Sequence, residues 1–342
     1  MSNYQEIKKA KKNAEIPFDV EQWIQSISGF TFETKMIPMP REWGIAIIQH
    51  YDHVLLHHKD NGYSQETEKI LTSIADAIDE VIKSFGSAVF VRLSTRSPKD
   101  AVLVGEGDVV KRTAAEMKSK GENLDLNTKL MCLSFGMQEA LKVHSGKEAM
   151  ALITNSERVA IDLKQSRDYS DKWEMNIIVR KWVDIPHGRE FRGFVHKGQF
   201  NALSAYDNII CYPYIVKNKE AIAKKTRDLW EQFKDSVPMD SYVVDFAILS
   251  DETCVVVELN PFNNYEGAGT GASLFHWKYD EKVLHEGPFE FRIVEKPRED
   301  LERRVYPDWM ELIEAAERLV AKEKEQALNP PVVNEEKRCN VM

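Results

Sequence analysis

The residues best placed to do chemistry are two acids and an amide, Asp245, Glu258 and Asn260, in two β-rich runs joined by a polar segment. The pattern is typical of a hairpin, although Asp251-Glu252 is a weaker two-residue turn than Asn-Gly. Pairing outward from that turn places Asp245 opposite Glu258. Because side chains alternate along a strand, we expect Asp245, Glu258 and Asn260 on one face of the hairpin.

Two carboxylates about 5 Å apart across a hairpin repel one another unless a cation lies between them. Magnesium suits such an oxygen-rich set, because it keeps several waters and takes further ligands from substrate phosphates. The sequence therefore predicts a metal site formed by Asp245, Glu258 and Asn260. The alternative is an amphipathic hairpin on which Asp245 and Glu258 face solvent.

Several arginines could neutralise an oxyanion near this site. Arg92 and Arg96 alternate with Ser94 along one predicted strand, which indicates a basic edge facing a pocket or, alternatively, a solvated edge whose aliphatic stems cover the core. Arg189 and Arg192 are candidate catalytic residues, because planar guanidinium groups bind oxyanions through two hydrogen bonds. For Arg192 a structural ion pair with the neighbouring Glu190 is an equal alternative.

Composition excludes several classes of protein. The 46 Lys and Arg against 55 Asp and Glu give a formal charge of −9 without a basic stripe, so direct nucleic-acid binding is not expected. No apolar run of about 18 residues occurs and the first 20 residues are charged, which favours a cytoplasmic protein. The four cysteines form no CxxC pair, and neither the GxGxxG nor the GxxxxGK[ST] fingerprint is present.

The elements that must position these residues follow from hydrophobic periodicity. Helices are predicted at residues 63–85, with Ser64 as N-cap and Gly86 as terminator, and at 109–118, 126–143, 220–234 and after Pro307. Strands are predicted at 88–93, 175–185, 190–195, 200–205, 242–249 and 254–259, and a short apolar piece at 150–154. Helices segregated from a mostly antiparallel sheet indicate the α+β class.

The predicted domain organisation has five parts. A polar, loosely held N-terminal segment (1–30) precedes an N-terminal lobe (31–170) and a C-terminal lobe with the metal-binding hairpin (171–300). A C-terminal helix (301–328) and a flexible tail (329–342) follow.

Four ordered segments resemble the cell division cycle protein 123 family, across about residues 85–295. They are residues 92–101, residues 179–182 leading into 189–195, Asp245 with residues 258–262, and residues 273–277. The resemblance implies an ATP-grasp fold, with two α+β lobes enclosing a nucleotide cleft, and a protein that assists assembly of eukaryotic translation initiation factor 2.

The resemblance also assigns roles to residues. Arg92 stands where the family usually has a phosphate-contacting lysine, and Asp245, Glu258 and Asn260 would hold Mg²⁺ on the phosphates of ATP. Residues of the strand that would border the adenine are Val179, Arg180, Lys181 and Trp182, and Arg192 joins this nucleotide-binding set. Trp182, like most aromatic residues on strands, is expected to pack rather than to stack on a ligand. Glu258 replaces a usual aspartate, and the family's N-terminal signature is absent, which leaves open a paralogue with another client.

Three functions remain open at this stage. The first is an assembly factor whose ATP-bound state binds a protein client, the gamma subunit of initiation factor 2. The second is an ATP-dependent carboxylate-amine ligase, which would use the same residues for phosphate positioning. The third is a scaffold that does not bind nucleotide. The sequence does not settle whether the chain is an enzyme.

The final residues, Cys339-Asn-Val-Met342, fit a CaaX box for farnesylation, although Asn is not aliphatic. Glu335 and Glu336 offset Lys337 and Arg338, so no polybasic second signal supports a stable membrane anchor. Peripheral membrane association therefore depends on lipidation of Cys339, and a chance tail is the equal alternative.

Overall fold

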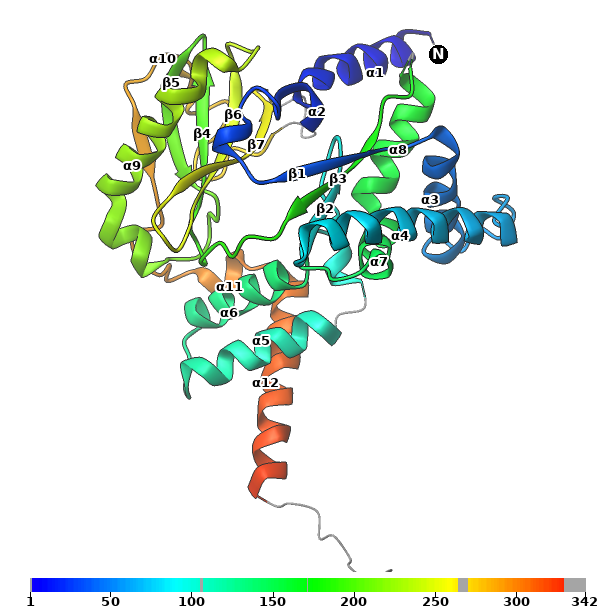
Figure 1. Ribbon diagram of the computed structural model, residues 1–342. Helices are drawn as coiled ribbons and strands as arrows, with labels where there is room; N and C mark the ends of the chain where they lie inside the picture. The colour runs from blue at the N-terminus through cyan, green and yellow to red at the C-terminus, as the bar shows by residue number, and fades with distance from the viewer. Residues whose placement is uncertain (1, 105–106, 171, 264–269, 329–342) are drawn as a thin grey trace, which may run out of the picture.

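The computed structural model describes residues 2–104, 107–170, 172–263 and 270–328. The chain forms two lobes, one built on an antiparallel sheet and the other on a mostly antiparallel one, above a layer of helices (Figure 1). The smaller sheet has the strand order β1-β3-β2, and the larger has the order β7-β6-β4-β5-β8.

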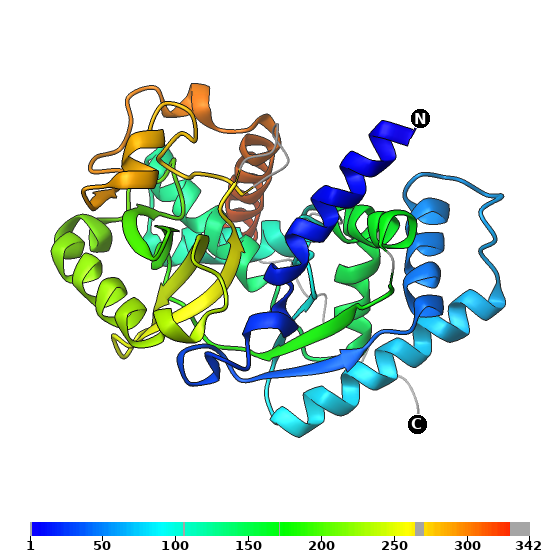
Figure 2. The ribbon, with the colours of Figure 1, turned by 90° about the horizontal axis from the view of Figure 1, so that it is seen from above.

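The N-terminal lobe packs helices against one face of the smaller sheet (Figure 2). Its strands are β1 (Thr34–Pro38), β2 (Val89–Leu93) and β3 (Asn176–Lys181). Its helices are α3 (Arg41–Val54), α4 (Gln65–Phe85), α7 (Gly146–Asn155) and α8 (Glu157–Tyr169). Alternation along the strands turns Val91 and Val179 into the core beneath these helices, so the neighbouring residues Phe90 and Arg180 face the other way.

Helix α4 begins and ends where the sequence predicts. Ser64 accepts a hydrogen bond from the backbone of Thr67, whose hydroxyl in turn accepts from the Ser64 backbone, forming a capping box. Gly86 ends the helix in the left-handed region, at φ 63°, which glycine adopts without steric cost.

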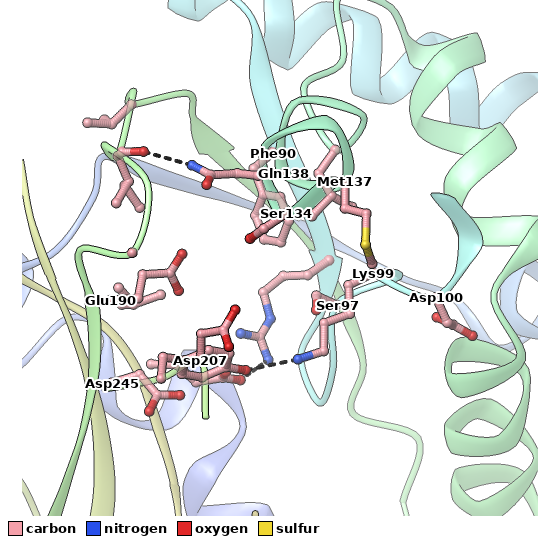
Figure 3. Close-up of a pocket in the computed structure, with 18 of the residues that line it drawn as sticks. Phe90, Ser97, Lys99, Asp100, Ser134, Met137, Gln138, Glu190, Asp207 and Asp245 are labelled. Atoms are coloured by element: carbon pink, nitrogen blue, oxygen red, sulfur yellow. Dashed lines mark hydrogen bonds and ion pairs between the residues drawn. The ribbon is translucent and has the colours of Figure 1, made fainter. Parts of the chain in front are cut away.

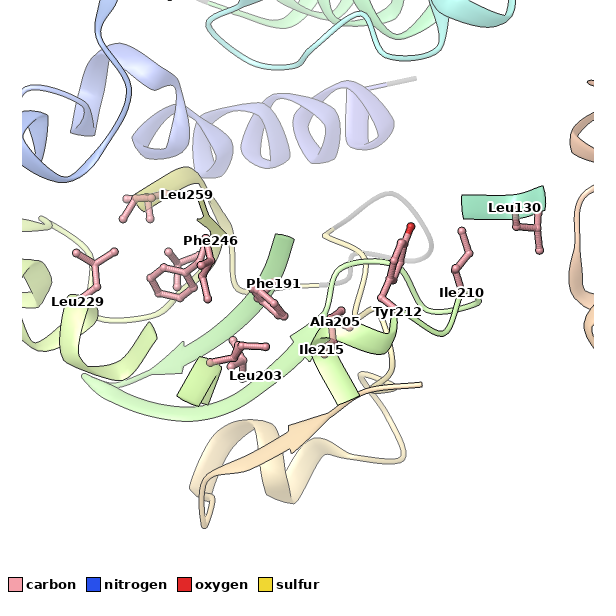
Figure 4. Packing of buried hydrophobic residues seen from close by; sticks show 14 of the residues in the cluster. Leu130, Phe191, Leu203, Ala205, Ile210, Tyr212, Ile215, Leu229, Phe246 and Leu259 are labelled. Atoms are coloured by element: carbon pink, nitrogen blue, oxygen red, sulfur yellow. The ribbon is translucent and has the colours of Figure 1, made fainter. Parts of the chain in front are cut away.

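The C-terminal lobe has the larger sheet. Its strands are β4 (Glu190–His196), β5 (Gln199–Ala205), β6 (Tyr242–Ile248), β7 (Cys254–Pro261) and β8 (Glu290–Arg292), and only β5 and β8 pair in parallel. Helix α9 (Pro213–Phe233) covers one face, where Leu229 packs with Phe246 and Leu259 (Figure 4). Helix α10 (Glu281–Glu286) lies on the other face, where Leu284 clusters with Phe194 and Phe275.

The remaining helices lie outside the two sheets. Helices α5 (Gly107–Lys120), α6 (Leu126–Glu139) and α12 (Pro307–Leu328) pack together, and α11 (Leu301–Arg304) precedes α12. At the N-terminus lie α1 (Ser2–Glu15) and α2 (Val20–Trp23). Single 3₁₀ turns occur at η1 (Ile16–Phe18), η2 (Ser28–Phe30), η3 (Ala101–Leu103) and η4 (Lys234–Ser236).

The structure differs from the predicted organisation in three places. The N-terminal segment is not a loose polar arm, because Val20, Trp23 and Ile27 are fully buried in the main core. The strand predicted at 175–185 belongs to the sheet of the N-terminal lobe as β3, although the sequence boundary assigned it to the other lobe. The apolar piece at 150–154 is part of helix α7, and β1, α3 and α8 had no sequence prediction.

Candidate functional site

A cleft of about 610 Å³ lies between the two lobes (Figure 3). The N-terminal lobe contributes Phe90 and Arg92 from β2 and Arg180 from β3, and the C-terminal lobe contributes Glu190, Asp245 and Glu258. Helix α6 adds Ser134, Met137 and Gln138, and Leu141 follows just after it; Tyr306, just before α12, and Trp309 in its first turn complete the lining. The cleft therefore has one apolar end and one charged end.

The hairpin of β6 and β7 pairs Asp245 with Glu258, which confirms the predicted register. The predicted turn is wrong, because Leu249 and Thr253 close a three-residue loop in which Glu252 has φ 67°. A bulge between Asp245 and Phe246 then shifts the pairing by one residue. Because the two irregularities cancel, the carboxylates still lie opposite one another.

Asp245 is 2% exposed and is held by Arg192. The Nε and Nη2 atoms of Arg192 donate to the two carboxylate oxygens, each at 2.8 Å, and Nη1 donates to the Gly271 carbonyl at 2.7 Å. The pair is therefore Arg192–Asp245 and not Arg192–Glu190, the alternative from the sequence. Although burial disfavours its charge, the Asp245 carboxylate holds the pKa of Arg192 above its ordinary value. Asn260 donates its Nδ2 to Asp245 at 3.3 Å.

Glu258 has its own guanidinium partner, Arg92, at 2.6 Å. Arg92 also donates to the carbonyls of Leu93, at 3.1 Å, and Thr95, at 2.8 Å. Burial by itself would raise the pKa of Glu258, but the positive charge of Arg92 holds that pKa below its ordinary value. Arginine therefore supplies the positive charge that the two carboxylates require, and the Arg92–Glu258 pair joins β2 of one lobe to β7 of the other.

Arg180 is the most unusual group in the cleft: it is 3% exposed, its guanidinium lies 5.8 and 5.9 Å from the ring centres of Trp23 and Phe32, and only one of its nitrogens has a hydrogen-bond partner in the described chain. Its Nη1 donates to the Val257 carbonyl at 2.6 Å, while Nε and Nη2 have no hydrogen bond. Burial, together with the charge of Arg92, lowers the pKa of Arg180 to about 9. A buried cation with unused donors is costly unless an acceptor binds to it.

The structure places the remaining predicted residues differently. Lys181 and Trp182 line the cleft, but the Val179 side chain lies in the core of the N-terminal lobe. Arg96 pairs with Asp162 of α8 and not with the cleft. Arg192 and Asn260 support Asp245 from behind and do not line the cleft themselves.

Arg189, a candidate catalytic residue, does not line the cleft. Its Nη1 lies 2.8 Å from the Glu252 carboxylate, and its guanidinium stacks 3.6 Å from the ring centre of Tyr214. Lys225 also contacts Glu252 at 2.8 Å and is the main cause that lowers the pKa of Glu252 to about 2. Arg189 therefore fixes the hairpin loop to helix α9.

Several cleft residues had no role predicted from the sequence. Lys99 donates to the Tyr206 hydroxyl at 2.9 Å. Arg158 begins α8, where Asp100 accepts from its backbone at 3.1 Å, and its guanidinium has no partner among the described residues. Lys99 lies within one of the resembling segments, which is the signal that could have identified it, but nothing local to α8 marks Arg158.

Glu190 provides a pH-dependent test of the cleft's electrostatics. Burial, with a contribution from the charge of Asp245, raises the pKa of Glu190 from 4.5 to about 7. The folded state then binds a proton that the unfolded chain has already lost, so stability falls as the pH rises from about 4.5 to about 7. Glutamine cannot lose a proton, so we expect the free energy of unfolding of Glu190→Gln, measured in urea, to rise relative to that of wild type by roughly 1–2 kcal/mol between these two pH values. The expected effect is kept modest because Glu190 retains some contact with solvent. An unchanged difference between pH 5 and pH 8 would exclude the elevated pKa.

Two negative findings concern only the described chain. Within it, no three His, Cys, Asp or Glu residues are grouped so that they could hold a metal ion. None of its helices is both long and apolar enough to cross a membrane. Cys339, the predicted lipidation site, lies outside the described residues.

Comparisons with known proteins show which family and which relatives this chain resembles. The sequence model of a family described as D123 matches residues 135–308. A protein named translation initiation factor eIF2 assembly protein from Candida albicans is 24% identical over 252 residues, covering 70% of this chain and 61% of that protein. A protein of the same name from Xenopus laevis is 26% identical over 220 residues, covering 62% and 54%. This chain thus spans between about half and three fifths of the length of these curated relatives.

The solved structure of Cdc123 from Schizosaccharomyces pombe has a similar fold. Its TM-score is 0.59 at 22% identity, and the match covers 83% of this chain and 98% of that one. Together with the two mostly antiparallel sheets, this likeness confirms the predicted α+β class, with two lobes around a cleft.

Proposed function

This chain belongs to the D123 family, and on that premise we propose that it binds Mg-ATP in the cleft and acts as an assembly factor for eukaryotic translation initiation factor 2. The names of the Candida albicans and Xenopus laevis relatives support the assembly role. The proposed client is the gamma subunit of that factor, and the proposed compartment is the cytoplasm.

Arg180 is the observation that carries the nucleotide part of the proposal. Its Nε and Nη2 are buried, without partners in the described chain, on the wall of the cleft that also holds Arg92 and Lys99. Guanidinium groups of this kind bind phosphate through two hydrogen bonds. The apolar end of the cleft, lined by Phe90 and Met137, offers a surface for a base. A nucleoside polyphosphate fits both ends.

The residues also fit magnesium. Glu258 lines the cleft with a carboxylate of which one oxygen contacts Arg92. Asn260, near it on β7 but outside the cleft lining, uses its Nδ2 on Asp245 and would turn its amide oxygen to the metal. Magnesium commonly binds through one or two carboxylates and phosphate oxygens. When bound, it would neutralise charge on the phosphates. Asp245 would hold Asn260 in place and complete the oxygen-rich set, with Arg192 fixing its orientation.

Calorimetric titration with ATP, with and without Mg²⁺, tests this proposal. We expect wild-type protein to bind ATP only with magnesium, and Glu258→Gln to bind at least about tenfold more weakly, because an amide oxygen attracts the metal less than a carboxylate. Glu258 suits the test because its side chain is 25% exposed, and the variant keeps an acceptor for Arg92.

Glu290→Gln is the matched control, because Glu290 pairs with Arg292 on β8 and does not line the cleft. Wild-type protein that binds no nucleotide would overturn the proposal. Co-purification with the gamma subunit, dependent on ATP, tests the assembly role. Phosphate release that requires a small carboxylate or amine substrate would instead indicate the ligase.

A further inference from the structure

Gln138 connects helix α6 to the segment between β3 and β4. Its Nε2 donates to the Ile185 carbonyl at 2.9 Å, and both residues line the apolar end of the cleft (Figure 3). Phe90, Met137 and Leu141 line the same end. The Gln138 amide is therefore a polar group in mostly apolar surroundings.

The orientation of this amide is fixed by its partner. A backbone carbonyl only accepts hydrogen bonds, so the NH₂ of Gln138 must face Ile185, and its oxygen must face away. Figure 3 shows that oxygen on the side of the open space, and no described residue donates to it. Rotation of the amide would set its oxygen against the Ile185 carbonyl, which is unfavourable.

The position of Gln138 relative to the charged end fits a base. Phe90 and Arg92 lie two residues apart on β2 and face the cleft together, and Arg180, which starts opposite Phe90 on β3, extends its guanidinium to the Val257 carbonyl beside Glu258 at the charged end. A nucleotide with its phosphates at Arg92 and Arg180 would thus place its base beside Gln138.

We propose that Gln138 selects the base of the nucleotide: its fixed amide oxygen accepts a hydrogen bond from an exocyclic amino group and so favours 6-aminopurine nucleotides. A 6-oxopurine would present a carbonyl to that oxygen, and two acceptors repel. This inference rests on the proposed nucleotide binding and adds the residue that determines base specificity. Sites built to donate to or accept from a ligand group reject the analogue that lacks it.

The experiment combines one change in the ligand with one in the protein. Wild type, Gln138→Met and Gln232→Met are titrated with ATP, GTP and purine riboside triphosphate, in which hydrogen replaces the amino group. Gln232 is the matched control, because its Nε2 likewise donates to a backbone carbonyl, that of Asp228, but on the solvent-exposed face of α9. Thermal unfolding checks that each variant is folded.

We expect wild type and Gln232→Met to bind ATP about ten- to hundredfold more tightly than GTP or the purine analogue. Gln138→Met should bind ATP no more than about threefold more tightly than the purine analogue, because only its affinity for ATP falls. Equal binding of ATP and the purine analogue by wild type, or an unchanged ratio in Gln138→Met, would overturn the inference while nucleotide binding stands. Wild type that binds none of the three would overturn both.

Discussion

Replacing Asp245 with alanine is expected to lower the free energy of unfolding by about 3–5 kcal/mol, whether or not ATP is present. Arg192 is nine-tenths buried and directs two of its nitrogens at the Asp245 carboxylate. Without that carboxylate, a guanidinium remains in the protein interior with the Gly271 carbonyl as its one hydrogen-bond partner among the described residues and the Tyr206 ring 4.9 Å away. Urea unfolding followed by circular dichroism measures the change.

Asp280→Ala is the matched control. Asp280 also binds an arginine, Arg292, through two contacts of 2.8 Å, but the two side chains are 19% and 29% exposed. Water can replace the lost carboxylate there, so we expect a loss of about 1 kcal/mol. Similar losses in both variants would show that burial of Arg192 does not set the cost. The prediction also explains why loss of ATP binding in Asp245→Ala would not by itself identify a metal ligand.

The hairpin shows what the sequence can and cannot predict. Alternation of Val residues with Asp245 and Glu258 predicted both strands and the pairing of the two carboxylates. Whether the loop has two or three residues, and where a bulge compensates for it, depends on tertiary packing, because Arg189 and Tyr214 hold Glu252 in its position. Period-two patterns are local, whereas these contacts join distant segments.

The charge partners in the cleft were not predictable for the same reason. Arg92 meets Glu258 across the interlobe gap, and Arg192 meets Asp245 on an adjacent strand, so sequence neighbours such as Glu190 were misleading. The sequence also assigned β3 to the wrong lobe, because its apolar pattern resembles that of the strands that follow it. Gln138 was missed because helical periodicity does not indicate which polar residue faces a cleft.

Arg180→Met is expected to weaken ATP binding roughly ten- to hundredfold and, at the same time, to raise the free energy of unfolding by about 1 kcal/mol. Arg180 makes a single hydrogen bond, to Val257, at the cost of burying a charge beside Arg92. Methionine fills similar space without that cost. Binding sites often retain groups that destabilise the unliganded fold, because the ligand pairs with them.

Arg92→Met is the matched comparison, and its stability should change in the opposite direction. Arg92 has three partners, and its loss removes the guanidinium that pairs directly with the Glu258 carboxylate, so we expect a loss of about 3 kcal/mol. ATP titration and urea unfolding of both variants separate the two roles. If Arg180→Met is less stable than wild type and binds ATP unchanged, Arg180 is a structural residue and its unused nitrogens do not serve a ligand. If stability rises while affinity falls, the buried guanidinium is held ready for an oxyanion.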